Sequence, residues 1–188
     1  EADATFVDCE FTNNHAVVNT TVGGAVYVAE NSVVFFIDTL WKGNSSRVGG
    51  GALGARTGVE IYVHASEFID NHANPEGHAV ASTGGAINVG NGLLRVTNTR
   101  FESNETGAYG GAIYAIGSWQ DPISVPRTDV IVANSTFVNN RAARHPSVQA
   151  SFPTEGGAVN IEDQTQLRVY HSRFINNEAH IGGGINVY

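Results

Sequence analysis

Apolar residues along the 188-residue chain recur in short alternating runs rather than in helical stripes. After each of several glycine pairs, apolar and polar positions alternate strictly, as in Val26-Tyr27-Val28. This two-residue period is typical of a strand with one buried face. No segment carries a 3.6-residue apolar stripe of useful length. The pattern therefore predicts strands throughout the chain.

A nine-residue block occurs six times without gaps, at residues 6–14, 36–44, 63–71, 96–104, 132–140 and 169–177. Its sixth position is always aromatic, and holds Phe11, Trp41, Phe68, Phe101, Phe137 and Phe174. Its ninth position is always asparagine: Asn14, Asn44, Asn71, Asn104, Asn140 and Asn177. The fourth position is always small.

A second block follows each of these, with a glycine pair, a small residue and an aliphatic one, as in Gly84-Gly85-Ala86-Ile87. The pairs begin at Gly23, Gly50, Gly84, Gly110, Gly156 and Gly182. The residue that directly follows the aliphatic one is predicted to point outward, because successive side chains of a strand alternate between its two faces. This column reads Tyr27, Gly54, Asn88, Tyr114, Asn160 and Asn186.

Repetition of this kind predicts an all-β fold, a right-handed parallel β-helix of about six coils. We expect residues 1–188 to form a single β-helix domain. One repeat cannot bury its own apolar face, but coils stacked about 4.8 Å apart pair their strands and align equivalent residues in columns. The aromatic column then becomes a stack, and the asparagine column a ladder of side-chain amides. The glycines are expected to allow a bend with positive φ or a close backbone approach.

Extra residues interrupt the repeat on alternate coils, at 15–22, 72–83 and 141–155, with a further insertion at 117–128. Loops that grow on a rigid scaffold often carry function. Insertions also cost little stability, so they need not have a role. Both interpretations are open from the sequence.

Composition narrows the classes of partner. The net charge of −8 and ten scattered basic residues argue against nucleic-acid binding. No apolar run approaches the 18 residues that predict a membrane span. Cys9 is the single cysteine, so no disulfide forms within the chain. The first residue is Glu1, there is no methionine, and both ends fall inside a repeat, which together favour an excerpt of a longer polypeptide.

The alternating Gly-Gly-Ala-Ile and Phe-x-x-Asn motifs resemble the repeat of the chlamydial polymorphic membrane proteins. The pair recurs six times in fixed order over nearly the whole chain. Departures are Trp41 at an aromatic position, Leu53 at an aliphatic one and Gly184 for alanine. The resemblance implies a right-handed β-helix in a secreted or surface-exposed region associated with adhesion.

The sequence gives little support for a catalytic or metal-binding site. Asp8 and Asp38 share a column on adjacent coils and are the only candidate catalytic pair, although an aspartate at a bend needs no chemistry. His15 and His72 occupy equivalent positions two coils apart, about 10 Å, which is too far for one metal ion. Neither a metal nor another cofactor is therefore expected. Glu67 and Arg100 are expected to form an ion pair between neighbouring coils.

Glycosylation acceptors of the Asn-x-Ser/Thr form occur at Asn19, Asn44, Asn104 and Asn134. Asn44 and Asn104 are ladder positions and should point inward. Asn19 lies in an inserted loop and is the best candidate.

The outward column suits polar and aromatic contacts, so Tyr27, Asn88, Tyr114, Asn160 and Asn186 are the candidate binding residues. The predicted function is a non-catalytic extracellular or cell-surface module, adhesive or structural, that contacts a protein or glycan ligand. It is expected not to span a membrane, and to form a homo-oligomer or fibre if its coils continue. The alternative is a carbohydrate-active β-helix enzyme of the polysaccharide lyase or glycoside hydrolase type.

Overall fold

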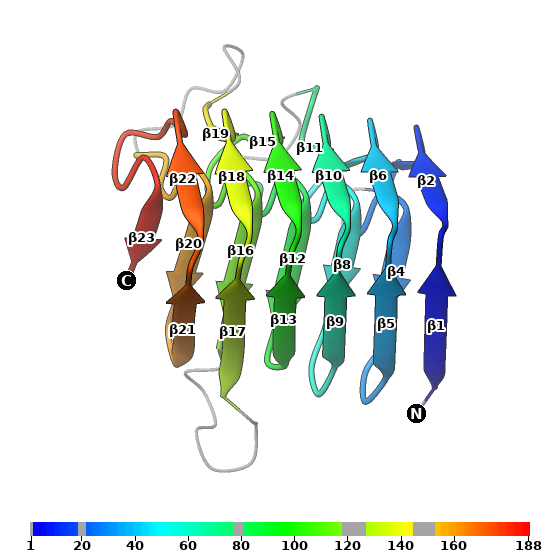
Figure 1. Cartoon of the computed structure of the whole chain (residues 1–188). Coiled ribbons are helices and arrows are strands. Elements are labelled where there is room, and N and C mark those ends of the chain that lie inside the picture. The colour runs from blue at the N-terminus through cyan, green and yellow to red at the C-terminus, as the bar shows by residue number, and fades with distance from the viewer. Residues whose placement is uncertain (1, 19–21, 77–80, 118–126, 145–152) are drawn as a thin grey trace.

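A computed structural model describes residues 2–18, 22–76, 81–117, 127–144 and 153–188, which fold entirely as strands, turns and bends (Figure 1). The first sheet contains β1 (Asp3–Val7), β5 (Val33–Ile37), β9 (Glu60–His64), β13 (Leu93–Thr97), β17 (Thr128–Ala133) and β21 (Thr165–Tyr170). The second contains β2 (Glu10–Thr12), β6 (Leu40–Lys42), β10 (Glu67–Ile69), β14 (Arg100–Glu102), β18 (Thr136–Val138) and β22 (Arg173–Ile175). The third contains β3 (His15–Ala16), β7 (Ser45–Ser46), β11 (His72–Ala73), β15 (Glu105–Thr106) and β19 (Arg141–Ala142). The fourth contains β4 (Val26–Val28), β8 (Leu53–Ala55), β12 (Ile87–Gly90), β16 (Ile113–Ile116), β20 (Val159–Glu162) and β23 (Ile185–Val187).

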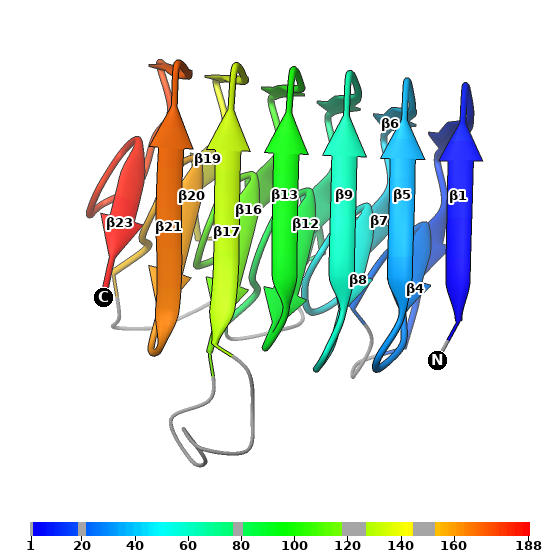
Figure 2. The same ribbon diagram turned by 60° about the horizontal axis from the view of Figure 1, so that its bottom comes forward.

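Each strand pairs in parallel with the equivalent strand one coil away, so the sheets run along the rod (Figure 2). The chain ends lie at opposite ends of this rod. Register is in step with the repeat: Phe36 pairs with Val63, and Val96 with Val132. This confirms the predicted parallel β-helix of about six coils. Within the described residues, no helix has the length and apolar character needed to cross a membrane.

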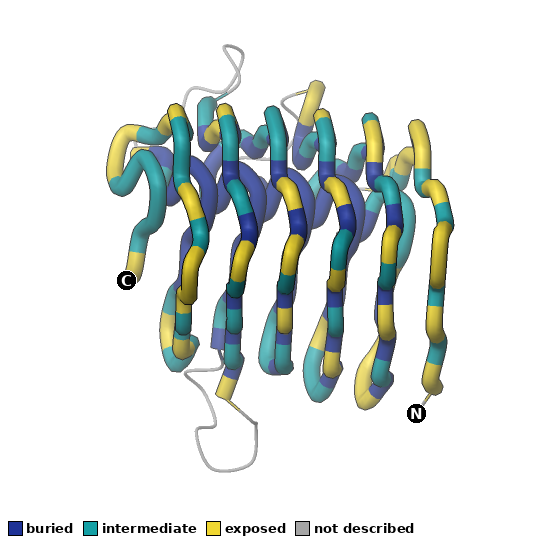
Figure 3. The backbone as a smooth tube through the Cα atoms, viewed as in Figure 1, coloured by how far each residue is buried: buried dark blue, intermediate teal, exposed yellow. Residues whose placement is uncertain are grey.

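Aromatic side chains stack along the core. Trp41 and Phe68 have ring centroids 5.2 Å apart, and Phe101 and Phe137 have centroids 4.7 Å apart with nearly parallel planes. All four of these side chains are fully buried. Figure 3 shows the buried positions concentrated in the middle coils. The end coils are more exposed, because each has a neighbouring coil on one side only.

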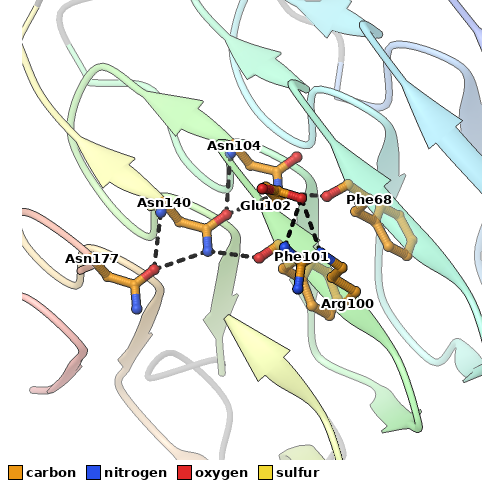
Figure 4. A network of polar contacts seen from close by, with 7 residues as sticks. All are labelled: Phe68, Arg100, Phe101, Glu102, Asn104, Asn140 and Asn177. Carbon is orange, nitrogen blue, oxygen red and sulfur yellow. Dashed lines mark hydrogen bonds and ion pairs between the residues drawn. The ribbon is translucent and has the colours of Figure 1, made fainter. Parts of the chain in front are cut away.

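The asparagine column forms a continuous ladder (Figure 4). The side-chain amide of Asn104 donates to the Asn140 side-chain oxygen at 2.9 Å and to the Phe68 backbone carbonyl at 2.9 Å. Its own side-chain oxygen accepts from the backbone N–H and the side-chain amide of Asn71, at 3.1 and 2.9 Å. The same four bonds recur at Asn44, Asn71 and Asn140. Every polar group of these buried amides is therefore satisfied.

The two glycines of each pair have different roles. The first has positive φ, as at Gly110 with φ 68°, a conformation that glycine adopts at little cost. The second lies against the next coil: a Cβ on Gly111 would stand 1.9 Å from the carbonyl oxygen of Gly157. Both of the roles expected for the glycines are therefore found, one at each position.

We expect replacement of Asn104 by alanine to lower the free energy of unfolding by at least about 3 kcal/mol, because it leaves several buried polar groups unpaired. The exposed Asn14 provides a matched control, since Asn14→Ala removes one side-chain bond to Asn44. That variant should lose less than about 1 kcal/mol. Urea denaturation measures both changes, and equal losses would contradict the ladder's role.

Gly111→Ala should destabilise the fold by about 2–4 kcal/mol, since the added methyl group meets the backbone of the next coil. Gly90 is the control, because a Cβ there has its nearest neighbour, the Ile116 side chain, at 3.9 Å. Gly90→Ala should change the stability by less than about 1 kcal/mol. Thermal unfolding of the two variants tests this, and a tolerated Gly111→Ala would show that the coils can separate to accept it.

Candidate functional site

The outward column of the fourth sheet contains all five predicted binding residues in register. Tyr27 pairs with Gly54, Asn88 pairs with Gly54 and Tyr114, and Asn160 pairs with Tyr114 and Asn186. Tyr27 is separated from the others by Gly54, which presents no side chain. The remaining four residues occupy successive coils along one face.

The exposure of this column departs from the prediction. Tyr27 is 49% exposed, but Tyr114 is 7% exposed and Asn160 is fully buried. Tyr114 and Asn160 therefore lack the exposure that was expected of this column. Asn88 and Asn186 are partly buried.

A flanking row explains the burial. The residue just before each glycine pair bridges to its equivalent in the next coil, and this row consists of Val22, Gly49, Thr83, Tyr109, Glu155 and Ile181. Asn88 donates to the Thr83 hydroxyl, and the ring of Tyr109 lies 6.3 Å from that of Tyr114. The row thus lies against the outward column and covers much of it.

Where the two rows meet on coils four to six, six residues form a cluster, which we call the tyrosine–carboxylate cluster: Tyr109, Tyr114, Glu155, Asn160, Glu162 and Asn186. The Tyr114 hydroxyl donates to Glu162 at 2.9 Å, and the Asn160 amide donates to the other Glu162 oxygen at 2.8 Å. The Asn186 amide donates to the Asn160 side-chain oxygen at 2.8 Å and to Glu155 at 2.9 Å. Two carboxylates are therefore connected through two asparagines.

The electrostatics of the cluster follow from partial burial. Burial, followed by the nearby charge of Glu162, raises the pKa of the Tyr114 hydroxyl, which stays protonated and donates. The pKa of Glu155 is raised by burial first and by Glu162 second, and is lowered by the hydrogen bond from Asn186. The cluster therefore combines amide and hydroxyl groups with a carboxylate that gains a proton more readily than usual.

Sequence reasoning missed Glu155 and Glu162. Glu162 lies two residues after Asn160 on β20, so the alternation that places Asn160 on the outward face also places Glu162 there. The sequence therefore did contain the information needed to find Glu162. Glu155 precedes a glycine pair, and nothing in the repeat indicated that this position turns toward the outward column.

Asp8 and Asp38 lie at the corner between the first and second sheets, and both are exposed. Their φ angles are 54° and 51°, and the same column has positive φ at Ala65, Asn98, Asn134 and His171. Aspartate and asparagine tolerate this left-handed conformation better than most residues do. The geometry gives the two aspartates a role in the bend, and they are not part of the tyrosine–carboxylate cluster.

The other candidate residues fall as follows. His15 and His72 both pair with Ser45, which stands between them. Among the residues that the structure describes, there is no group of three or more His, Cys, Asp or Glu side chains that could hold a metal ion. Glu67 and Arg100 are register partners, but the Arg100 guanidinium forms its ion pair with Glu102 of its own strand at 2.9 Å. Two residues apart on one strand, these side chains share a face. The charge of Glu67 raises the pKa of Arg100 less than Glu102 does, so Glu67 acts on the guanidinium without being its close partner.

The candidate glycosylation sites differ in how far they are buried. Asn44 and Asn104 are fully buried in the ladder, which confirms that they point inward. Asn19 lies outside the described residues, and Asn134 is exposed at its corner.

Comparison with known proteins identifies the repeat. The family model of the Chlamydia polymorphic membrane protein repeat matches residues 8–29 and 98–116. Each match joins an Asn-containing block to the following glycine pair, so the chain contains repeats of this type. No curated protein and no solved structure matches the chain.

We expect Glu162→Gln to lower the pKa of Glu155, because it removes a neighbouring negative charge. The pKa should remain above its ordinary value, since burial is the larger cause. A raised pKa favours the protonated form in the folded state, so the contribution of Glu155 to stability is lost as the pH rises through that pKa. An NMR titration of the Glu155 carboxyl carbon measures the shift, with Glu60→Gln on the first sheet as control. An unchanged pKa in Glu162→Gln would show that the two carboxylates do not interact.

Proposed function

We propose that this chain is a non-catalytic module of an extracellular or cell-surface protein, built as a rigid rod that binds a protein or glycan partner. The observation that carries the proposal is that the repeated residues contact neighbouring coils inside the rod. The ladder asparagines bond one another, the aromatic rings stack, and the second glycine of each pair lies against the next coil. Residues available for recognition are therefore those outside the repeat's fixed positions.

The type of repeat supports the proposed location. Its family is named for a membrane protein of Chlamydia, and the described part of this chain has no helix able to cross a membrane. A rod that stands outside a membrane and carries an adhesive surface is consistent with both findings. Stacking coil on coil also suits a structural component of a homo-oligomer or fibre.

The proposed contact surface is the fourth sheet's outward face, from Tyr27 through Asn88 to the exposed parts of the tyrosine–carboxylate cluster. A half-exposed tyrosine supplies apolar area and a hydroxyl group together. Asparagine amides and carboxylates supply hydrogen bonds to sugar hydroxyls or to polar protein groups. Tyr114 and Asn160 support this surface from beneath rather than contacting a ligand.

The enzymatic alternative has one observation in its favour. Glycoside hydrolysis needs two carboxyl groups, one of which has a raised pKa, and Glu155 and Glu162 are such a pair. Glu162, however, accepts hydrogen bonds on both of its oxygens, and Glu155 accepts one from Asn186. These bonds hold the carboxylates within the scaffold, which favours a structural role for them.

The double variant Tyr27→Ala/Asn186→Ala should weaken binding to cultured-cell surfaces or arrayed glycans at least tenfold, because it removes contacts at both ends of the face. Tyr170→Ala is the matched control: Tyr170 is 50% exposed but lies on the first sheet. Binding is measured with fluorescently labelled protein, after circular dichroism has shown that the variants fold. Equal binding by all three proteins would exclude this face. Glycan turnover that is lost in Glu162→Gln would replace the proposal with the enzymatic alternative.

A further inference from the structure

The outward face of the first sheet carries an exposed apolar strand. β5 consists of five apolar residues in a row, Val33-Val34-Phe35-Phe36-Ile37. Val34 and Phe36 are buried in the core, so the other three side chains point outward. Each of the other five strands of this sheet, by contrast, points at least one charged side chain outward. A strand that is apolar on both sides is typical of one that is covered on both faces.

This apolar surface continues into the next coil. The Phe35 ring is 38% exposed and stacks on the Tyr62 ring, with centroids 4.7 Å apart and planes 8° from parallel. The strands of the sheet lie side by side along the rod and form one face (Figure 2). Because stacked rings cover each other's faces, they present their edges outward. That arrangement suits packing against another sheet better than stacking on the ring of a ligand.

The charges on this face are divided between the two halves of the rod. Strands β1, β5, β9, β13, β17 and β21 belong to coils one to six in that order. Coils one to three point two carboxylates and no lysine or arginine outward, from Asp3 and Glu60. Coils four to six point two arginines and one carboxylate outward, from Arg95, Arg168 and Asp129. A second copy of the chain that runs in the opposite direction therefore brings each half of the face against the opposite charge.

Arg95 and Glu60 carry most of this complementarity, since they lie on adjacent coils at the middle of the rod. Arg95 is exposed and belongs to none of the ion pairs between described residues. The Tyr62 hydroxyl donates to the Glu60 carboxylate at 2.8 Å, which holds the carboxylate beside the ring. A guanidinium can bond such a carboxylate and contact the aromatic ring at the same time.

A two-fold axis parallel to the strands, between coils three and four, places coil three of one copy against coil four of the other. Arg95 then faces Tyr62 and Glu60 of the second copy, and the contact forms twice. The same axis sets Phe35 on coil two against Ile131 on coil five, both in the central column of the face. Two copies that ran in the same direction would instead set Arg95 against Arg95. The charges therefore favour the antiparallel arrangement.

The size of the face sets the strength of this pairing. Six strands about 4.8 Å apart, each five residues of about 3.3 Å, cover about 470 Å². Two such faces bury roughly 950 Å² together, which is at the low end for specific protein interfaces. The association is therefore weak and reversible.

We propose that the outward face of the first sheet is a self-association surface, on which two copies of the chain pair in antiparallel orientation. Arg95 bonds Glu60 of the second copy on both sides of the two-fold axis, and the apolar residues of β5 are covered. The surface shares no residue with the contact face on the fourth sheet. It therefore does not rest on the proposed function.

Sedimentation equilibrium of the whole chain tests the proposal and should show a reversible monomer–dimer equilibrium with a micromolar Kd. Arg95→Glu and Glu60→Arg should each raise that Kd at least about tenfold, because like charges then face each other. An equimolar mixture of the two variants should associate about as tightly as the original chain. In the mixed dimer, each glutamate again faces an arginine.

Arg173→Glu is the matched control, because Arg173 is exposed but lies on the second sheet. It should leave the Kd unchanged, as should Tyr27→Ala/Asn186→Ala on the contact face. Circular dichroism first establishes that each variant folds. The proposal is overturned if the chain stays monomeric up to millimolar concentration, if Arg95→Glu dimerises as well as Arg173→Glu, or if the mixture fails to associate. Loss of the dimer in Tyr27→Ala/Asn186→Ala would also overturn it, by placing the association on the fourth sheet.

Discussion

An asparagine side chain has two N–H groups and a carbonyl oxygen that accepts two hydrogen bonds, and the middle coils of this rod use all of them. At Asn71, the donors go to Asn104 and to the Trp41 carbonyl, and the acceptor receives the backbone and side-chain N–H groups of Asn44. Three successive coils are joined at one residue. A shift of register would break these bonds for the whole column, so the ladder fixes how every other column aligns.

The remaining columns depend on this alignment. Aromatic rings stack only when equivalent residues lie directly above one another, as Phe68 and Phe101 do at 4.8 Å. Close contact between coils in turn requires the second glycine of each pair. Once the interior is fixed, a residue's place in the repeat decides whether it can contribute to recognition.

Much of this arrangement could be predicted from the sequence, because each column consists of residues that occupy the same position in a short repeated block. The ladder, the aromatic stack and the need for glycine all follow from aligning six short blocks. The burial of Tyr114 and Asn160 could not be predicted, because it depends on the residue just before each glycine pair. That position is different in every coil, and it holds Tyr109 and Glu155 on coils four and five. The partner of Arg100 could not be predicted either, because Glu67 is its register partner while Glu102 lies two residues along its own strand, and the structure pairs it with Glu102.

Hydrogen exchange of the asparagine side-chain amides tests the central claim, that the ladder holds the coils together. The side-chain N–H groups of Asn71 and Asn104 should exchange only through global unfolding, with protection equal to that of the slowest backbone amides. The exposed Asn14 amide, observed in the same NMR spectra, should exchange far faster. If the Asn71 and Asn104 side chains exchanged as fast as Asn14 while the backbone strands stayed protected, the rod would be held by its sheets alone, and the account would be wrong.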